Sequence, residues 1–360
     1  MTIPNTMRAM VTMGHGDLDQ MVLHEDWPTP SPVNGEVLIR VRACGLNNTD
    51  VNTRSGWYSK AVTDATTSSG YDTVDEEDPT WGGAPITFPR IQGADVCGEI
   101  VAVGSGVDTA RIGERVITDG WLRDPSDPTN MDKTGYFGSE RNGGFAEYTT
   151  TWAQNAIPVS SPLSDAELAT FSCSYSTAEG MLTRAELTER DTVLVPGASG
   201  GVGGALVQLA KRRGARVIAM TSDAKREDVA KLAPDMIIGR NPSNLQAELS
   251  GEKVTVVADV VGGDYFPTLI DILERGGRYT CSGAIAGPIV ELDLRTFYLR
   301  DLTFTGSTVI DPTVTQNLIK YIEADEIKPV LAATYPLDEL RDAQAAFIAK
   351  KHTGNIVVVP

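Results

Sequence analysis

The segment TVLVPGASGGVGGALVQLAKRRGARVIAMTS, residues 192–222, constrains the fold more than any other part of the 360-residue chain. An apolar strand over 193–195 runs into a glycine-rich turn and an amphipathic helix, and a second apolar strand follows. Glycine permits positive φ and lets a phosphate approach main-chain N–H groups, while a helix N-terminus supplies partial positive charge. We therefore expect a strand–turn–helix–strand unit that binds the pyrophosphate of a dinucleotide.

One position of this turn departs from the G-x-G-x-x-G pattern of dinucleotide-binding folds, because Ala198 stands in the place of the first glycine. The pattern reads A-x-G-x-x-G, and a tight strand-to-helix turn without a ligand would use similar residues. The flanking strands and helix favour the dinucleotide interpretation. The residues expected to hold the pyrophosphate are Ala198, Ser199, Gly200, Gly201, Val202 and Gly203.

The end of the second strand indicates which dinucleotide binds. NAD-binding folds usually place an Asp or Glu there, where it accepts hydrogen bonds from the adenosine ribose. This chain has Thr221 and Ser222 at that end, followed by Lys225, and such groups suit a 2′-phosphate that a carboxylate would repel. Asp223 argues the other way, since it lies only two residues past the expected position. We expect NADPH, with Arg240 as a further cation after the third strand.

Two sequence rhythms divide the chain. Up to about residue 160, short β-rich runs alternate with Gly, Pro and Asp turns, and from about residue 165 strands alternate with helices, as in a parallel sheet covered on both faces. The polar stretches 59–83 and 121–144 lack periodicity, so each is a functional lid or is partly disordered. The predicted domains are 1–165, 166–312 and a C-terminal return over 313–360.

Composition and charge exclude several classes of function. The net charge of −17 repels nucleic acid and anionic membranes, so we expect a small-molecule substrate and neither of those partners. No apolar run is long enough to cross a membrane, and the N-terminus lacks the apolar core of a signal peptide. The four cysteines are widely scattered, which fits reduced thiols. The sequence therefore predicts a cytoplasmic protein.

The order of these parts resembles the medium-chain dehydrogenase/reductase superfamily. The motifs that carry the resemblance are GASGGVG, DVVGG at 259–263, GGRYTCSG at 276–283 and the final HTGNIVVVP. The resemblance implies an α/β protein with a Rossmann-type doubly wound parallel sheet and a GroES-like β-rich catalytic domain. It also implies that further residues contact the cofactor, namely Thr177, Gly262, Ser282, Gly283 and Lys350.

The residues that bind zinc in other members of this superfamily are replaced here. Asn47 stands at the position of the cysteine ligand, since Cys44 lies three residues too early, and the Gly-His-Glu motif reads Gly93-Ala94-Asp95. Amide and methyl side chains cannot replace a thiolate and an imidazole as ligands. No C-x₂-C pair exists for a structural zinc lobe. We therefore expect no metal.

The stretch CGLNNTDVNTRSGWY is similar to a segment of the zinc-independent quinone oxidoreductases and enoyl reductases. Their pattern N-x-x-D-x-x-x-x-x-G-x-Y is met by Asn47, Asp50, Gly56 and Tyr58. The resemblance implies hydride transfer to a quinone, enone or enal, with Tyr58 as hydrogen-bond donor to the substrate oxygen and with Asn47 and Asp50 shaping the pocket. A donor at that oxygen stabilises the developing enolate.

Two alternatives and an assembly state remain open at this stage. GYFGSERNGGFAEY is similar to a stretch of crotonyl-CoA carboxylase/reductases in which a Glu at the place of Glu140 lies near the reacting centre, so enoyl-CoA reduction is an alternative. A non-catalytic NADPH-binding protein is an alternative of another class. The segment 299–310 reads as an edge strand of the cofactor sheet, which predicts a homodimer.

Overall fold

The computed structural model describes residues 2–67, 69–75 and 77–360. The chain forms two compact units. We call Met1–Val62, Thr67–Cys173 and Asp311–Pro360 the β-rich unit, and Thr63–Thr66 with Ser174–Ile310 the α/β unit. Among the described residues, no helix is both long and apolar enough to cross a membrane.

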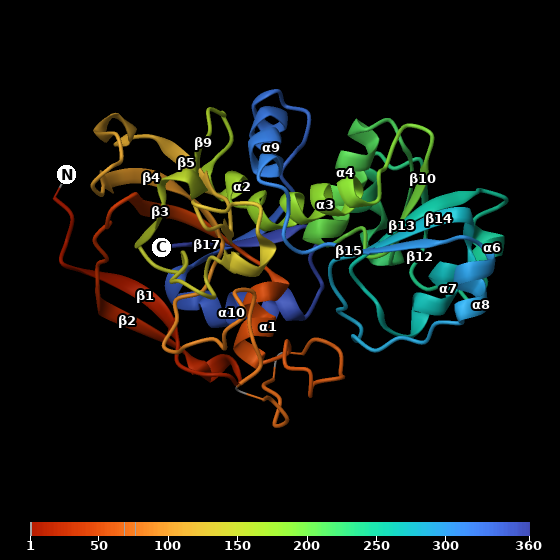
Figure 1. The fold of residues 1–360 in the computed structure, drawn as a ribbon, viewed down its shortest axis with the longest axis horizontal. Helices are drawn as coiled ribbons and strands as arrows, with labels where there is room; N and C mark the ends of the chain where they lie inside the picture. The colour runs from red at the N-terminus through yellow and green to blue at the C-terminus, as the bar shows by residue number, and fades with distance from the viewer. Residues whose placement is uncertain (1, 68, 76) are drawn as a thin grey trace. The chain divides into compact units, whose positions relative to one another are not determined.

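The α/β unit is built on a six-stranded parallel sheet in the order β12-β11-β10-β13-β14-β15. The central strands β10, β11 and β13 are rich in Val, Ile, Leu and Ala and are mostly buried, as expected for strands covered on both faces. Helix α4 lies on one side of this sheet and α7 on the other (Figure 1). This arrangement confirms the predicted doubly wound sheet.

The strands of the α/β unit are β10 Thr192–Val195, β11 Arg216–Thr221, β12 Met236–Gly239, β13 Val254–Asp259, β14 Leu273–Cys281 and β15 Thr303–Gly306. Its helices are α3 Ser172–Arg184, which begins in the β-rich unit, α4 Gly201–Arg212, α5 Arg226–Ala230, α6 Leu245–Glu248, α7 Phe266–Asp271 and α8 Leu294–Leu299.

The β-rich unit is built on a seven-stranded sheet in which β16-β17-β3-β4-β5-β9 follow one another and β8 also pairs with β3. All pairs except β16–β17 are antiparallel. The C-terminal strand β17 pairs with β3, with Val357 opposite Gly45, so the end of the chain completes the sheet begun near its start. The separate hairpin β1–β2 packs on the same apolar core, which contains Met10, Val11 and Met21.

The strands of the β-rich unit are β1 Thr6–Thr12, β2 Met21–Pro28, β3 Glu36–Leu46, β4 Asp95–Val103, β5 Arg115–Thr118, β6 Trp121–Leu122, β7 Gly135–Tyr136, β8 Tyr148–Trp152, β9 Ala156–Pro158, β16 Leu331–Pro336 and β17 Asn355–Val359. Its helices are α1 Asn48–Ser55, α2 Asp165–Leu168, α9 Thr313–Glu323 and α10 Leu340–Ile348.

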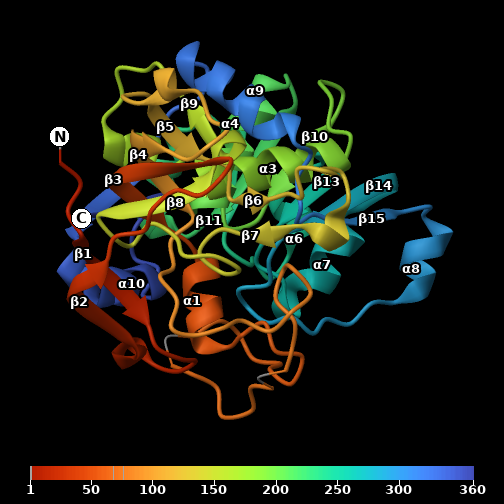
Figure 2. The same cartoon turned by 60° about the vertical axis from the view of Figure 1, so that its left-hand side comes forward.

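The two polar stretches without periodicity have local structure. In 121–144, β6 and β7 form a two-stranded ribbon (Figure 2), with Trp121 directly opposite Tyr136. The described part of 59–83 consists of turns held by hydrogen bonds: Lys60 N–H donates to Asp78 at 2.8 Å, and Asp75 N–H donates to Ser59 Oγ at 3.0 Å. Ser68 and Glu76, within the stretch expected to be a lid or partly disordered, lie outside the described residues.

Candidate active site

The three predicted catalytic residues lie in or next to helix α1, with Asp50 inside the helix, Asn47 before it and Tyr58 after it. Asn47 precedes its first turn in an extended conformation, and Gly56 ends it in the left-handed conformation with φ 80°, where glycine is favoured. The helix is almost entirely buried despite its polar sequence. Arg54 is fully buried and donates from Nε to Gln344 at 2.9 Å and from Nη1 to the Gly16 carbonyl, so it joins α1 to α10 and to the loop after β1.

Asp50 fixes the start of α1 to the loop that precedes β4. Its carboxylate accepts the Asn47 N–H at 2.8 Å through Oδ2 and the Gly93 N–H at 3.1 Å through Oδ1. Burial raises the pKa of Asp50 to about 7, although the two main-chain donors lower it in part. Both oxygens are engaged with the backbone, so Asp50 positions Asn47 and Gly93 and does not face outward.

Asp95 is a second buried carboxyl beside the first. Its Oδ1 accepts the Cys173 N–H at 2.9 Å. Burial raises the pKa of Asp95 to about 8, the Asn47 side chain lowers it by hydrogen bonding, and the nearby charge of Asp50 raises it further. Asn47 therefore bonds to two carboxyl groups, of which Asp95 is largely protonated and Asp50 about half protonated at pH 7.

The residues at the superfamily's zinc position do not fit a metal ion. Asn47 and Ala94 are buried without a metal-binding atom of the required kind, as the sequence indicates. Burial and the neighbouring Asp50 and Asp95 raise the pKa of the Cys44 thiol well above its ordinary value, which disfavours the thiolate that zinc requires. Across the described residues, no group of three or more His, Cys, Asp or Glu side chains is arranged to hold a metal.

Tyr58 folds back along α1. Its hydroxyl forms hydrogen bonds with the side chains of Asn52 and Thr49. Burial raises the pKa of Tyr58 above its usual value, these two contacts lower it in part, and Cys173 and Asp50 raise it again. The phenol is therefore neutral throughout the physiological pH range and can donate a hydrogen bond.

Four aromatic side chains, from the two polar stretches and from the segment after α1, lie around Tyr58. Two of them contact the Tyr58 ring, and the other two contact Trp81. The sequence did not predict this group. The Trp81 ring meets the Tyr58 ring edge-on, with centroids 4.9 Å apart, and also contacts Trp121 at 5.9 Å and Tyr136 at 5.8 Å. Trp57 contacts the other side of Tyr58 at 5.6 Å. The only sequence signal was that two stretches without periodicity contain three such residues, Trp81, Trp121 and Tyr136.

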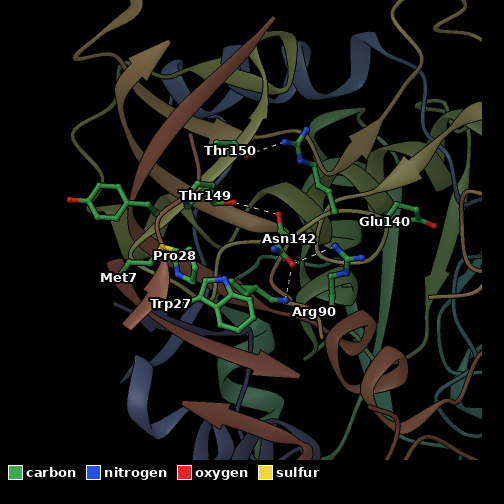
Figure 3. A pocket seen from close by; sticks show the side chains of 13 residues that line it. Met7, Trp27, Pro28, Arg90, Glu140, Asn142, Thr149 and Thr150 are labelled. Atoms are coloured by element: carbon green, nitrogen blue, oxygen red, sulfur yellow. Dashed lines mark hydrogen bonds between the residues drawn. The ribbon is translucent and has the colours of Figure 1, made fainter. Parts of the chain in front are cut away.

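Glu140 belongs to the same region, but its carboxylate is engaged within the protein. It accepts hydrogen bonds from the Thr80 hydroxyl, the Gly82 N–H and the Tyr136 N–H. A cavity of about 280 Å³ lies on the other side of this segment, lined partly by Trp27, Arg90 and Asn142. Figure 3 shows the Glu140 carboxylate pointing away from that cavity.

The glycine-rich turn between β10 and α4 depends on its glycines. Gly197 has φ 66°, and a Cβ added at Gly203 would lie 2.1 Å from the Gly197 carbonyl oxygen, so only glycine lets α4 pack this close to the turn. Ala198 N–H and Gly200 N–H donate to main-chain carbonyls. The first N–H groups of α4, at Gly201 and Val202, have no carbonyl partner within the helix, as at the start of any α-helix.

The residues predicted to contact the adenosine end lie together at the ends of two adjacent strands. Thr221 ends β11 and pairs with Gly239 of β12, which places Arg240 next to it. The Thr221 hydroxyl is buried and has no hydrogen-bond partner among the described residues. Burial and the positive charge of Arg240 lower the pKa of Lys225, so the two cations are close neighbours. Ser222 follows Thr221 at the start of the next turn.

The loop DVVGG is shaped by Asp259. Its carboxylate accepts the Val261 N–H at 2.7 Å, the Gly262 N–H at 3.2 Å and the Tyr279 hydroxyl at 2.8 Å. Ser282 N–H donates to the Asp259 carbonyl at 3.3 Å. The carboxyl ends of β13 and β14, with Gly262, Ser282 and the adjacent Gly283, are thus brought to one edge of the sheet, where ligands of such folds bind.

Two other predicted cofactor residues, Thr177 and Lys350, belong to different units of the chain. Thr177 lies within α3 and does not cap it. Lys350, in the β-rich unit, donates from Nζ to Asn48 Oδ1 at 2.9 Å and lies over the Phe347 ring at 3.6 Å from its centroid. The adenosine-phosphate role of Lys350 stays a prediction.

Five basic side chains that could contact coenzyme A phosphates have local partners within the protein. Arg123 forms a buried ion pair with Asp119 at 2.8 Å, and Arg141 pairs with Glu36 at 2.8 Å. Arg295 pairs with Asp293, Arg300 donates to the Asp271 carbonyl, and Lys133 lies near Asp124 and Asp127.

Comparison with known families matches both units. The sequence profile of the alcohol dehydrogenase GroES-like domain matches residues 33–161, and the profile of zinc-binding dehydrogenases matches residues 201–324. The chain is 30% identical to acryloyl-coenzyme A reductase of Metallosphaera sedula, over 98% of this chain and 99% of that protein. It is 26% identical to the NADPH-dependent alkenal/one oxidoreductase of Arabidopsis thaliana, over 100% of this chain and 81% of that protein.

Solved structures show the same fold. A Sinorhizobium meliloti 1021 protein with the provisional name of alcohol dehydrogenase is 45% identical, with a TM-score of 0.90 over 99% of this chain and 98% of that chain. A mycobacterial protein solved in complex with NADPH is 25% identical, with a TM-score of 0.78 over 99% of this chain and 100% of that chain.

Proposed function

Because the chain belongs to the medium-chain dehydrogenase/reductase superfamily and is an oxidoreductase of that fold, we propose that it reduces α,β-unsaturated carbonyl compounds or quinones with NADPH and without a metal. The observation that carries the proposal is the neutral Tyr58 hydroxyl, which hydrogen-bonds with Thr49 and Asn52 of the helix that starts after Asn47, the residue at the superfamily's zinc-ligand position. In the proposed reaction this hydroxyl would take the part that a zinc ion has as Lewis acid in the metal-dependent members of the superfamily.

The α/β unit has the features that NADPH requires. The first N–H groups of α4 would hold the pyrophosphate, and the absence of a side chain at Gly203 lets α4 pack directly against the turn. The unpartnered Thr221 hydroxyl, Lys225 and Arg240 would hold the adenosine 2′-phosphate. When bound, NADPH supplies a hydride to the β-carbon of the conjugated substrate.

Tyr58 would then stabilise the negative charge that develops on the substrate carbonyl oxygen. Thr49 and Asn52 lower the pKa of Tyr58, as groups that donate to its oxygen do, so the phenolic hydrogen can point to the substrate. Burial keeps that hydrogen in place by raising the pKa of Tyr58. Asn47 and Asp50 act through position: Asp50 secures the start of α1, from which Thr49 and Asn52 reach the phenol.

Reduction of an enoyl-CoA thioester is the second candidate, and the similarity to acryloyl-coenzyme A reductase favours it. The local pairing of Arg123 and Arg141 weighs against a cluster ready to bind the coenzyme A phosphates. A non-catalytic NADPH-binding protein is the candidate of another class.

Measuring NADPH oxidation against a panel of quinones, alkenals, enones and enoyl-CoA esters separates these candidates. We expect the highest kcat/KM with an enone, enal or quinone. A higher kcat/KM with enoyl-CoA esters favours the second candidate. Tight NADPH binding without turnover of any compound would favour the non-catalytic protein.

A further inference from the structure

Glu140 joins the two polar stretches of the β-rich unit. Its Oε1 accepts the Thr80 hydroxyl at 2.6 Å and the Gly82 N–H at 2.7 Å, and its Oε2 accepts the Tyr136 N–H at 2.6 Å. Hydrogen bonds to a carboxylate are stronger than those between neutral groups. Glu140, in the stretch 121–144, therefore binds the stretch 59–83 at Thr80 and Gly82 and binds the β6–β7 ribbon at Tyr136.

The space around Glu140 is tightly packed. A Cβ added at Gly82 or at Gly135 would lie 3.1 Å from Glu140 side-chain carbons, closer than ordinary van der Waals contact. Gly82 and Gly135 therefore fit beside the Glu140 side chain because they have no side chains of their own. This packing, together with three engaged donors, identifies the Glu140 contact as a specific joint between the two stretches.

Trp81 is the residue that the joint positions. Thr80 and Gly82 are its chain neighbours, so Glu140 holds the backbone on both sides of the indole. Trp121 and Tyr136, which Trp81 contacts, are 7% and 6% exposed and face each other across the β6–β7 ribbon at 4.9 Å. The half-buried Trp81 lies between this buried pair and Tyr58.

We propose that the aromatic cluster formed by Trp81, Trp121 and Tyr136 is the part of the substrate site that selects flat, uncharged, aryl-substituted enones. Trp81 is the specificity-determining residue, and Glu140 is the residue that positions Trp81. The proposal rests on the proposed function, because it takes Tyr58 as the donor to the substrate oxygen. An aryl group conjugated to the carbonyl lies in the plane of the enone, next to the ring that packs on Tyr58. Aromatic rings favour such neighbours in stacked or edge-on geometry.

The cluster offers no charge to a substrate. The basic residue of the β6 segment, Arg123, is paired with Asp119 in a buried ion pair. The Glu140 carboxylate keeps its charge, but both of its oxygens are directed to the Thr80 hydroxyl and to the Gly82 and Tyr136 N–H groups. A substrate chosen by this surface is therefore recognised by shape and aromatic contact, and a small alkyl enone gains little from it.

The first test compares Trp81→Ala and Trp81→Phe with wild type on benzylideneacetone and on methyl vinyl ketone, with Trp27→Phe as a control outside the cluster. We expect Trp81→Ala to lower the ratio of kcat/KM for the aryl over the vinyl ketone about 10-fold, in line with the loss of one aromatic contact and its buried area. Trp81→Phe should keep the ratio within about threefold. An unchanged ratio, or an equal loss on both ketones, would overturn the proposal, since an equal loss means that Trp81 only supports Tyr58.

The second test concerns Glu140→Gln, with Glu114→Gln as a control for removing a charged acceptor elsewhere. An amide has one acceptor oxygen, so the variant must release the N–H of either Tyr136 or Gly82. We expect faster amide hydrogen exchange at the released groups and a shift of the ketone ratio in the same direction as Trp81→Ala. Unchanged exchange and an unchanged ratio would contradict the positioning role.

A binding measurement separates failure of this inference from failure of the proposed function. Benzylacetone, the saturated ketone, is titrated into the NADPH-bound protein, wild type and Trp81→Ala, and its Kd is measured by calorimetry. We expect the Kd to rise about 10-fold in the variant, whether or not enones are turned over. Turnover of enones with equal Kd values would leave the proposed function standing and refute the role of Trp81. Equal Kd values without turnover would refute both.

Discussion

Replacing Asp95 by Asn should change how the stability of the β-rich unit depends on pH. Burial raises the pKa of Asp95 to about 8 and that of Asp50 to about 7, from an ordinary value of 3.8. At pH values between the ordinary pKa and the raised pKa, these carboxyl groups stay protonated in the folded protein but have lost their protons in the unfolded chain. The free energy of unfolding therefore falls as pH rises, by about 1.4 kcal/mol per pH unit for each carboxyl.

Asp95→Asn removes one of these two protonation sites and preserves the packing. The amide oxygen can still accept the Cys173 N–H, which lies 2.9 Å from Asp95 Oδ1. Between about pH 5 and pH 7 the variant should gain roughly 3 kcal/mol relative to wild type. For a unit of this size that gain corresponds to a relative rise in melting temperature of roughly 6–12 °C.

Tryptophan fluorescence is a direct assay of this unit. All five tryptophans of the chain, at 27, 57, 81, 121 and 152, belong to it. Melting curves are recorded at half-unit steps of pH for wild type, for Asp95→Asn and for the surface control Asp26→Asn. If the melting temperatures of wild type and Asp95→Asn change equally with pH over this range, the assignment of a buried, protonated Asp95 is refuted.

Three further predictions concern the cofactor, the metal and the assembly. NADPH should give a higher kcat/KM than NADH, and Thr221→Asp should weaken NADPH binding by about 1–3 kcal/mol in calorimetry; equal values for the two cofactors would contradict this. Chelator-treated, dialysed enzyme should keep full activity, whereas one zinc per chain with loss of activity on its removal would contradict metal independence. Sedimentation should show a homodimer, because β15 is an edge strand and Leu294, Tyr298 and Leu299 are 57–64% exposed nearby. Leu299→Asp should shift the dimer toward the monomer, and a wild-type monomer of 38.5 kDa at micromolar concentration would refute it.

The fold class and the superfamily were predictable because their signals are local in sequence. The strand, glycine turn and helix over 192–212 follow directly from periodicity and from the backbone freedom of glycine. Likewise, Thr221 and Arg240 meet because parallel strands end at one edge of a sheet. These features need no knowledge of contacts between distant residues.

The surroundings of Tyr58 were not predictable, because they depend on contacts between distant segments. The Trp81 ring contacts Tyr136 because Glu140 forms hydrogen bonds with Gly82 and Thr80, which precede it in the sequence by 58 and 60 positions. The protonation of Asp50 and Asp95 depends on burial by elements that the sequence does not place. Glu140 was considered as an acid near the reacting centre, whereas the structure engages its carboxylate as an acceptor.

The central claim is that Tyr58 donates a hydrogen bond to the oxygen of a conjugated substrate, and Tyr58→Phe tests it most directly because only the hydroxyl is removed. On an enone accepted by the wild type, kcat/KM should fall by about 10²-fold, the range of a lost acid or oxyanion donor, while the Kd for NADPH stays unchanged. A quinone should be affected less, since its reduced form is a stable aromatic diol. A kcat/KM within about threefold of wild type on every enone and enoyl substrate would contradict the account, because the loss of an essential donor costs far more.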